Sequence, residues 1–375
     1  MAVKVLVVDD SFFYRKILTE ALRSLPGVEV VGGVANGANV LSKVRELAPD
    51  LITLDIEMPG MNGIEVMNAL RQSGLDVKVL VVSSVTVSGG RLTMQALQNG
   101  AFDFITKPDG TSLEENRKAI RAELAPRLRA VAHRVEVQNI LRPGAAAAPR
   151  PTLSDKPPAF PSEAAAPPAA SASNFPPQLV RRPELVVIGV STGGPKALTT
   201  LLAALPRGLG VPILIVQHMP PIFTQVLATN LSAKSSAPVL EAKQDEAVVP
   251  NTAYLAPGGK HMRLVAGAAG TKLLQLTEDP PENCCRPAVD YLFRSVAQNF
   301  PGKALAVILT GMGEDGTAGL RLLRSTGSTV IAQDEASCVV FGMPKAAIEA
   351  GVVDHVLPLG MIADRIATLV GGPRR

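Results

Sequence analysis

Short runs of aliphatic and β-branched residues alternate with longer amphipathic segments along the first third of the chain. Five such runs, each followed by a segment of helical length, occur at residues 3–8, 28–34, 51–54, 77–82 and 102–106. A repeated strand-then-helix order is typical of a doubly wound parallel sheet. In such sheets, binding and chemistry collect at the carboxyl ends of the strands. We therefore look for functional residues at those ends.

A second strand-and-helix pattern begins near residue 184. Residues 184–188 predict a buried strand, residues 189–195 form a glycine-rich turn, and residues 196–204 predict a helix. Further strands are expected at residues 211–216 and 304–309. The predicted fold class is therefore α/β, with two doubly wound, mostly parallel-sheet domains.

The region between the two patterns is rich in proline and alanine. Twelve of the 31 prolines fall in residues 126–183, a composition that favours an extended connection over a packed core. For a chain of 375 residues, we predict a domain at residues 1–124, a linker at residues 125–183 and a domain at residues 184–375.

Charge and composition exclude several classes of protein. The formal net charge of +4 comes from the linker, where eight basic residues stand against three acidic ones, so we expect no nucleic-acid partner. The chain has no apolar run of the ~18 residues that a transmembrane helix requires, which predicts no membrane insertion. Three cysteines, two of them adjacent, predict a reduced, cytoplasmic setting.

The predicted strand ends of the first domain carry acidic, hydroxyl and basic residues. Asp9 and Asp10 follow the first strand, Asp55 the third, Ser83 the fourth and Lys107 the fifth. Three carboxylates at one edge repel one another unless a divalent cation neutralises them, and hard oxygen ligands suit Mg²⁺. One carboxylate could then attack phosphorus, while Lys107 balances charge on the transferred group and Ser83 hydrogen-bonds it.

These motifs resemble the receiver domain of response regulators, which has a five-stranded, flavodoxin-like fold. The matching stretches are residues 7–11 (VVDDS), 54–63 (LDIEMPGMNG), 82–84 (VSS) and 106–108 (TKP). The resemblance implies that a histidine kinase phosphorylates Asp55 and that Asp9 and Asp10, with Asp55, hold Mg²⁺. It also implies that Phe104 is the aromatic switch residue, acting with Ser83 and Lys107.

Asp103, the residue before Phe104, is expected at the surface.

The glycine turn of the second domain fits two chemistries. Its backbone N–H groups could hold a phosphate, as in a dinucleotide-binding fold, or its Gly-x-Ser-x-Gly pattern could present Ser191 as a nucleophile. The dinucleotide hypothesis requires an acid near the end of the second strand to hold a ribose. Residues 185–240 contain no acid, and the second strand ends at His218 instead. This favours Ser191 with His218 as its general base.

A serine and histidine pair needs a carboxylate that orients the imidazole. The predicted strand at residues 304–309 runs into a glycine-rich loop that contains Asp315. The order Ser, His, Asp differs from the Ser, Asp, His order of α/β-hydrolases, which indicates another scaffold. His261 is a competing base, placed in a loop rather than at a strand end. Cys284 and Cys285 are expected to serve packing.

The second domain resembles the catalytic domain of chemotaxis protein-glutamate methylesterases. Further matching stretches are residues 216–220 (VQHMP), 254–259 (YLAPGG), 286–290 (RPAVD) and 333–344 (QDEASCVVFGMP). Both domains and their order match this family outside the linker. The resemblance implies a Rossmann-like catalytic domain, methyl-accepting chemoreceptors as substrate, a chemotaxis histidine kinase as phosphoryl donor and no cofactor for ester hydrolysis.

The resulting hypothesis is a serine esterase that releases methanol from glutamate γ-methyl esters and also deamidates receptor glutamines. The resemblance assigns the stabilisation of the negative oxygen to the backbone N–H of Met312 and to the turn around Thr192. We hypothesise that the unphosphorylated receiver covers the Ser191 cleft and that phosphorylation opens it. The rival is a non-enzymatic regulator whose second domain binds a nucleotide or a protein, but the chain has neither a ribose acid nor a basic recognition helix.

Overall fold

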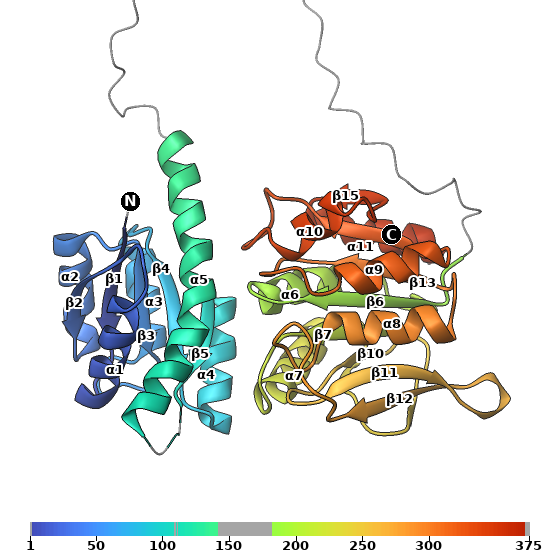
Figure 1. Cartoon of the computed structure of the whole chain (residues 1–375), viewed down its shortest axis with the longest axis horizontal. Helices are drawn as coiled ribbons and strands as arrows, with labels where there is room; N and C mark the ends of the chain where they lie inside the picture. The colour runs from blue at the N-terminus through green and yellow to red at the C-terminus, as the bar shows by residue number, and fades with distance from the viewer. Residues whose placement is uncertain (1, 109, 111, 142–181, 372–375) are drawn as a thin grey trace, which may run out of the picture.

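Two α/β domains make up the part of the chain that the computed structural model describes, which is residues 2–108, 110, 112–141 and 182–371 (Figure 1). Most of the predicted linker lies outside these residues. None of the described helices combines the length and the apolar character needed to cross a bilayer.

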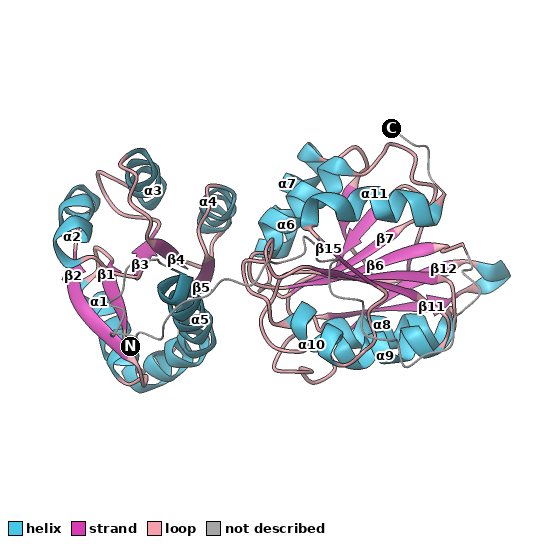
Figure 2. Ribbon diagram, turned by 90° about the horizontal axis from the view of Figure 1, so that it is seen from above, coloured by secondary structure: helices cyan, strands magenta, loops and turns pink. Residues whose placement is uncertain are grey.

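The first domain is a five-stranded parallel sheet in the order β2-β1-β3-β4-β5. Its strands are β1 (Val3–Val8), β2 (Val28–Val34), β3 (Leu51–Asp55), β4 (Lys78–Ser83) and β5 (Asp103–Thr106). Helices α2 (Val40–Leu47), α3 (Gly63–Gln72) and α4 (Val87–Gln98) cover one face, and α1 (Phe12–Arg23) and α5 (Leu113–Leu141) cover the other (Figure 2). A short 3₁₀ turn, Gly37–Asn39, precedes α2.

Strand β1 shows why the sequence forms a sheet that is covered on both faces. Leu6 and Val8 pack into the core beneath α2, α3 and α4, whereas Val5 and Val7 pack beneath α1 and α5, and all four are fully buried. Parallel strands buried on both faces read as continuous apolar runs, as this one does. The predicted flavodoxin-like arrangement is confirmed.

Helix α5 continues to Leu141, past the predicted domain end at residue 124. Leu124, Leu128 and Val131 recur at helical spacing and are buried in the core beneath α1. This apolar stripe extends the helix through Pro126, although a proline inside a helix costs about 3 kcal/mol. The proline and alanine composition therefore placed the start of the linker too early.

The second domain has a seven-stranded parallel sheet in the order β15-β14-β13-β6-β7-β10-β8. These strands are β6 (Leu185–Val190), β7 (Ile213–Gln217), β8 (Val239–Glu241), β10 (Ala253–Leu255), β13 (Ala304–Ile308), β14 (Thr329–Gln333) and β15 (His355–Leu357). A small antiparallel sheet contains β9 (Glu246–Ala247), β11 (His261–Ala266) and β12 (Lys272–Thr277), with a 3₁₀ turn at Ala268–Gly270.

Helices cover both faces of the seven-stranded sheet (Figure 2). One face carries α6 (Gly194–Ala204), α7 (Phe223–Lys234) and α11 (Leu359–Val370), and the other carries α8 (Val289–Asn299), α9 (Thr317–Ser325) and α10 (Met343–Glu349). The strand order reverses between β6 and β13, which is the point where open α/β sheets bind ligands. The predicted doubly wound, Rossmann-like fold is confirmed.

The two domains meet where α4 and β5 of the first pack against α6 and α7 of the second. The Phe104 ring stacks on the Phe223 ring, with centroids 4.7 Å apart and planes 30° apart. At the edge of this contact, Lys234 Nζ donates a hydrogen bond of 2.8 Å to Gln98 Oε1. The α4 and β5 face of the first domain therefore lies against the second domain.

Candidate functional site

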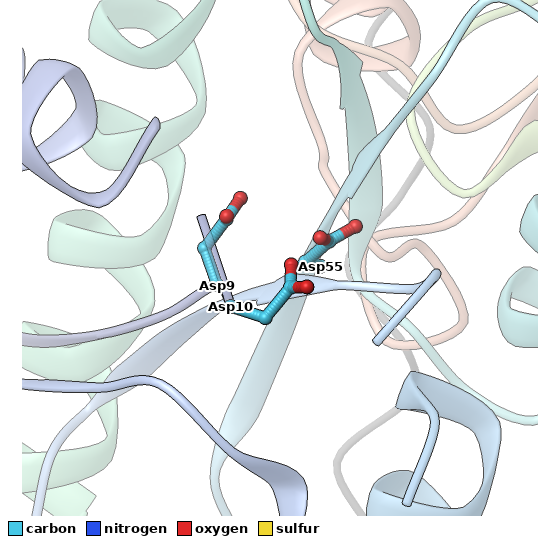
Figure 3. A group of neighbouring side chains, drawn as sticks. All are labelled: Asp9, Asp10 and Asp55. Carbon is cyan, nitrogen blue, oxygen red and sulfur yellow. The ribbon is translucent and has the colours of Figure 1, made fainter. Parts of the chain in front are cut away.

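Three carboxylates meet at the carboxyl edge of the first sheet (Figure 3). Asp9 and Asp10 follow β1 and Asp55 ends β3, so they stand at the two neighbouring strands where the strand order reverses. One oxygen from each of the three lies within 4.8 Å of the others. Asp9 and Asp55 are buried, whereas Asp10 is exposed. The structure thus brings together the three residues predicted to hold a metal.

Lys107 closes this acidic cluster from the end of β5. Its Nζ lies 2.7 Å from Asp55 Oδ2 and 3.0 Å from Asp9 Oδ2. The second contact is an ion pair without hydrogen-bond geometry, and no described residue donates a hydrogen bond to Asp9 Oδ2. Burial raises the pKa of Asp9 to about 6, with Lys107 opposing and the charge of Asp55 adding to the rise. A buried carboxylate oxygen without a donor, beside two further carboxylates, fits a divalent cation with a preference for oxygen ligands.

The other predicted switch residues point toward neighbouring helices. The Ser83 hydroxyl, at the end of β4, donates to Gly89 O at 3.3 Å and accepts from Thr93 Oγ1 at 2.7 Å. Phe104 contacts Phe223 of the second domain, as described above. Lys107 is therefore the one of these three that contacts Asp55 within the described residues.

Ser191, His218 and Asp315 follow three adjacent strands of the second sheet, namely β6, β7 and β13. Ser191 is the first residue after β6, and α6 begins three residues later. Gly193 makes this sharp turn possible, because its φ is +80° and a Cβ there would lie 2.5 Å from Val339 Cβ. The turn therefore presents Ser191 at the strand-order reversal.

His218 and Asp315 form a direct pair. His218 Nε2 lies 2.7 Å from Asp315 Oδ2, which leaves Nδ1 as the ring nitrogen available to a serine proton. Among the described residues, Ser191 Oγ makes no hydrogen bond to His218 or to any other group. Such nucleophile–base contacts are often long in the absence of substrate.

The Asp315 carboxylate lies at the amino-terminal end of α8. Its Oδ2 accepts a hydrogen bond of 2.7 Å from Val289 N and its Oδ1 one of 3.0 Å from Asp290 N. In return, Asp290 Oδ1 accepts 2.7 Å from Gly319 N in the first turn of α9. Asp315, which precedes α9, thus caps α8, and Asp290 of α8 caps α9. The partial positive charge of a helix amino terminus stabilises each carboxylate.

These contacts favour the charged forms of Asp315 and His218. Burial opposes the charge of Asp315, but hydrogen bonds from His218 and from the α8 backbone outweigh burial and lower the pKa of Asp315. Burial likewise opposes the charge of His218, but Asp315 and the Cys285 thiol outweigh it and raise the pKa of His218 to about 10. Asp315 and Cys285 thus favour the protonated form of the imidazole.

Two polar residues that the sequence analysis left without a role hold this site together. Gln217 Nε2 donates to Ser191 O at 2.9 Å and to His218 O at 3.1 Å, which ties the two turns to each other. Thr310 Oγ1 donates to Thr192 O at 2.9 Å. Both residues stand at the end of a buried strand, which is the only signal by which the sequence could have marked them.

Several backbone N–H groups near Ser191 have no acceptor within the described residues. They include the backbone N–H groups of Thr192 and Met312. Thr192 follows the serine directly, and Met312 lines the same cleft as Ser191. Free N–H groups beside a nucleophile are suited to stabilising a developing negative oxygen.

A cavity of about 540 Å³ lies in front of Ser191 and His218 and is lined by residues of both domains. The second domain contributes Ser191, His218 and Met312, and the first contributes Phe104 and Arg127. A larger cavity of about 800 Å³ includes none of the predicted site residues, so its size alone indicates no function.

Asp103, expected at the surface, is buried at the junction of the domains with 7% of its area exposed. Its Oδ2 accepts a hydrogen bond of 2.8 Å from Thr192 Oγ1 and lies 3.0 Å from Arg127 Nε. The expectation was wrong because these two partners, distant in sequence, satisfy the buried carboxylate.

The competing histidine is engaged elsewhere. His261 is fully buried, its Nδ1 accepts from Ala288 N at 3.2 Å and its Nε2 lies 3.1 Å from Pro280 O. It begins β11 rather than standing in a loop. The expected packing role of the adjacent cysteines does not hold for Cys284, which is exposed, and Cys285 is half-buried.

Comparison with known proteins gives the same two domains. A family model described as CheB methylesterase matches residues 186–366, and a response regulator receiver domain model matches residues 5–119. A solved structure titled as the catalytic domain of CheB methylesterase from Thermotoga maritima is 45% identical, covers 50% of this chain and 99% of its own, and has a TM-score of 0.49.

Three curated relatives extend over nearly the whole chain, and each is named protein-glutamate methylesterase/protein-glutamine glutaminase. The relative from Desulfotalea psychrophila is 46% identical over 98% of both chains. The relative from Geobacillus kaustophilus is 43% identical over 98% of this chain and 99% of its own. The relative from Thermotoga maritima is 40% identical over 98% of both chains. The chain therefore belongs to the family of protein-glutamate methylesterases/protein-glutamine glutaminases that carry a response regulator receiver domain.

Proposed function

We propose that this chain is a phosphorylation-regulated serine esterase that hydrolyses glutamate γ-methyl esters on methyl-accepting chemoreceptors, and so serves chemotaxis adaptation. The observation that carries the proposal is the placement of Ser191, His218 and Asp315 on three adjacent strand ends, with His218 hydrogen-bonded to Asp315 at 2.7 Å. Family membership supplies the substrate.

In the first step, Ser191 Oγ attacks the ester carbonyl and its proton passes to neutral His218. We assign that proton to Nδ1, because Nε2 is bound to Asp315. The resulting imidazolium returns the proton to the methoxide as it leaves, so methanol departs and an acyl-serine remains. Water then attacks through the same histidine and releases the glutamate side chain with free Ser191.

The free N–H groups of Thr192 and Met312 stabilise the negative oxygen of the tetrahedral intermediate. Removing one such donor typically costs about 3 kcal/mol of barrier. A primary amide passes through the same kind of intermediate, with ammonia as the leaving group. We therefore propose deamidation of receptor glutamines as a second activity of this site, in accord with the names of the relatives. Ester and amide hydrolysis at this site use no cofactor.

The receiver domain supplies the input. We propose that Asp55 accepts a phosphoryl group from a chemotaxis histidine kinase and that Asp9, Asp10 and Asp55 hold Mg²⁺. The close carboxylates and the Asp9 oxygen without a donor support this metal site. When bound, Mg²⁺ balances charge on the phosphoryl group, and Lys107 Nζ, 2.7 Å from Asp55 Oδ2, contributes to the same balance.

We propose that the receiver restrains the esterase in this arrangement. Its Asp103 and Phe104 contact the turn after Ser191 and the start of α7, and its residues form one wall of the cleft. We propose that phosphorylation of Asp55 shifts the domains to an open form.

The three free cysteines support a reducing, cytoplasmic location.

The test is methanol release from a methyl-labelled chemoreceptor by the full chain, with Mg²⁺ and a small phosphodonor such as acetyl phosphate. We expect Ser191→Ala to abolish release. Ser325→Ala, which changes an exposed serine at the end of α9, should leave release unchanged. Equal release by wild type and Ser191→Ala would contradict the proposal. No release by wild type would favour the non-enzymatic regulator.

A further inference from the structure

The turn between β12 and α8 has a backbone that sets one side chain in place. Glu282 N donates to Cys285 O at 3.1 Å and Cys285 N donates to Glu282 O at 2.8 Å. The two central residues, Asn283 and Cys284, have φ of +50° and +62°. This is a type I′ turn, in which both central residues are left-handed and in which asparagine is favoured at the first position.

The Asn283 side chain joins two buried carboxylates. Its Nδ2 donates to Asp315 Oδ1 at 2.8 Å and to Asp290 Oδ2 at 3.0 Å. Asp290 and Asp315 are 8% and 3% exposed. An amide nitrogen carries two hydrogens, so one neutral group satisfies both acids at once.

This bridge answers a specific electrostatic problem. Asp290 and Asp315 cap neighbouring helices and lie close together, and burial together with the charge of Asp315 raises the pKa of Asp290. Asp290 Oδ2 has no donor other than Asn283 among the described residues. Without the amide, two buried like charges would repel each other, and one would move or take up a proton.

We propose that Asn283 is a positioning residue of the esterase: by donating to Asp315 and Asp290 together, it keeps Asp315 ionised and aligned with His218. The inference rests on the proposed role of Asp315 in ester hydrolysis. Asn283 acts through Asp315, and Asp315 acts on His218 at 2.7 Å. If the Asp315 carboxylate rotated away from these donors, the His218 imidazole would lose its alignment.

The other charged or titratable groups that face this network are few. His218 lies on the far side of Asp315, and the Cys285 thiol faces His218 from the same turn. Glu282, which precedes Asn283, is paired with Arg294 of α8. Because Asn283 is neutral, its removal changes the potential at His218 without removing a formal charge.

The experiment uses two substitutions in the full chain and a matched control. Asn283→Gly removes the amide but retains the left-handed backbone, since glycine adopts positive φ without strain. Asn283→Asp retains the shape and replaces the donor with a third carboxyl group. Asn251→Gly is the control, because Asn251 is an exposed turn residue with φ of +60° at the other end of the domain, bonded to Gly210 N.

We measure kcat and KM for methanol release from methyl-labelled chemoreceptor across pH, with Mg²⁺ and acetyl phosphate present, and subtract release by Ser191→Ala. Thermal unfolding of each variant establishes the folded fraction. Asn283→Gly should lower kcat roughly 10- to 100-fold with little change in KM. The ascending limb of its kcat–pH profile should move to higher pH. The reason is that loss of the Asn283 amide, whose positive end faces Asp315, raises the pKa of His218.

Asn283→Asp should lose further activity as pH rises, relative to wild type, because the introduced carboxyl group ionises beside two others. Asn251→Gly should match wild type in kcat and in the position of the limb. A purely structural role for Asn283 predicts a lower folded fraction with an unchanged limb.

Either an unchanged limb or an unchanged kcat in the folded Asn283→Gly protein would overturn the proposal. If Ser191→Ala itself releases methanol like wild type, the triad fails, which is a separate result.

Discussion

Removing the Asp103 carboxylate should activate the unphosphorylated enzyme. Asp103 Oδ2 accepts a hydrogen bond of 2.8 Å from Thr192 Oγ1, and Thr192 adjoins Ser191, the proposed nucleophile. In Asp103→Ala this contact between the domains is lost, while the receiver retains Asp55 and Lys107. The closed arrangement is therefore weakened at the point where the receiver contacts the catalytic turn.

The magnitude follows from the kind of bond that is lost. A buried hydrogen bond to a charged group contributes about 1.5–3 kcal/mol, and about 1.4 kcal/mol corresponds to a tenfold change in an equilibrium constant. If the closed form predominates, the open fraction rises roughly 10- to 100-fold. It cannot exceed full opening, so stimulation by phosphodonor should shrink by the same factor.

The assay is methanol release from methyl-labelled chemoreceptor with and without acetyl phosphate and Mg²⁺. Asp103→Asn keeps an acceptor for Thr192 but loses the charge, so its basal rate should lie between wild type and Asp103→Ala. Gln98→Ala removes the exposed contact to Lys234 and should change the basal rate by about twofold or less.

Because Asp103 also pairs with Arg127 inside the receiver, the stability of the receiver and the stoichiometry of Asp55 phosphorylation are measured alongside. A basal rate equal to wild type, in an Asp103→Ala protein that is folded and still phosphorylated, would refute the reasoning. A basal rate that rises equally in Gln98→Ala would show that any weakening of the interface suffices.

Three further outcomes are expected. In Asp315→Asn, turnover should fall about 10⁴-fold. The ascending limb of its kcat/KM profile should move to lower pH, because the main group that raises the pKa of His218 to about 10 is gone. The stability that the His218–Asp315 pair contributes is present below pH ~6.5 and lost as pH rises toward ~10, so the unfolding temperature of wild type, but not of Asp315→Asn, should show that loss. Asp55→Asn should abolish stimulation by acetyl phosphate while retaining basal methanol release, and full stimulation would contradict the assigned input. Cys284→Gly should raise the free energy of unfolding by about 0.5–1 kcal/mol in urea titrations, because Cys284 is exposed and occupies a left-handed position that glycine favours. A destabilised variant would contradict the left-handed type I′ turn at residues 282–285.

Local patterns were enough to predict most of the two sheets. The runs at residues 3–8 and 28–34 became strands with the predicted bounds, because parallel strands buried on both faces are continuous apolar runs. The predicted positions of Ser191 and His218 followed directly, since both come immediately after such strands. Helix α5 was cut short because Leu128 and Val131 lie in a stretch whose composition is that of a linker.

Residues that act through distant partners could not be predicted in this way. Asp103 looks like a surface residue until Arg127 and Thr192 are placed beside it. Asn283 carries no motif-level signal, because its role depends on the reciprocal capping of α8 and α9 by Asp315 and Asp290. Which ring nitrogen of His218 faces Asp315 likewise depends on side-chain contacts that exist only in the folded protein.

Strand β5 carries both ends of the regulatory connection. Lys107, immediately after it, contacts Asp55, the proposed phosphoacceptor, while Asp103 and Phe104, at its start, contact the catalytic domain. An extended strand rises about 3.3 Å per residue, so the input and output contacts are separated by roughly 13 Å of one rigid segment. A shift of Lys107 along the strand axis is thus a shift of Asp103 as well. The proposed signal would therefore travel over four peptide units of one strand, without a chain of intermediate side chains.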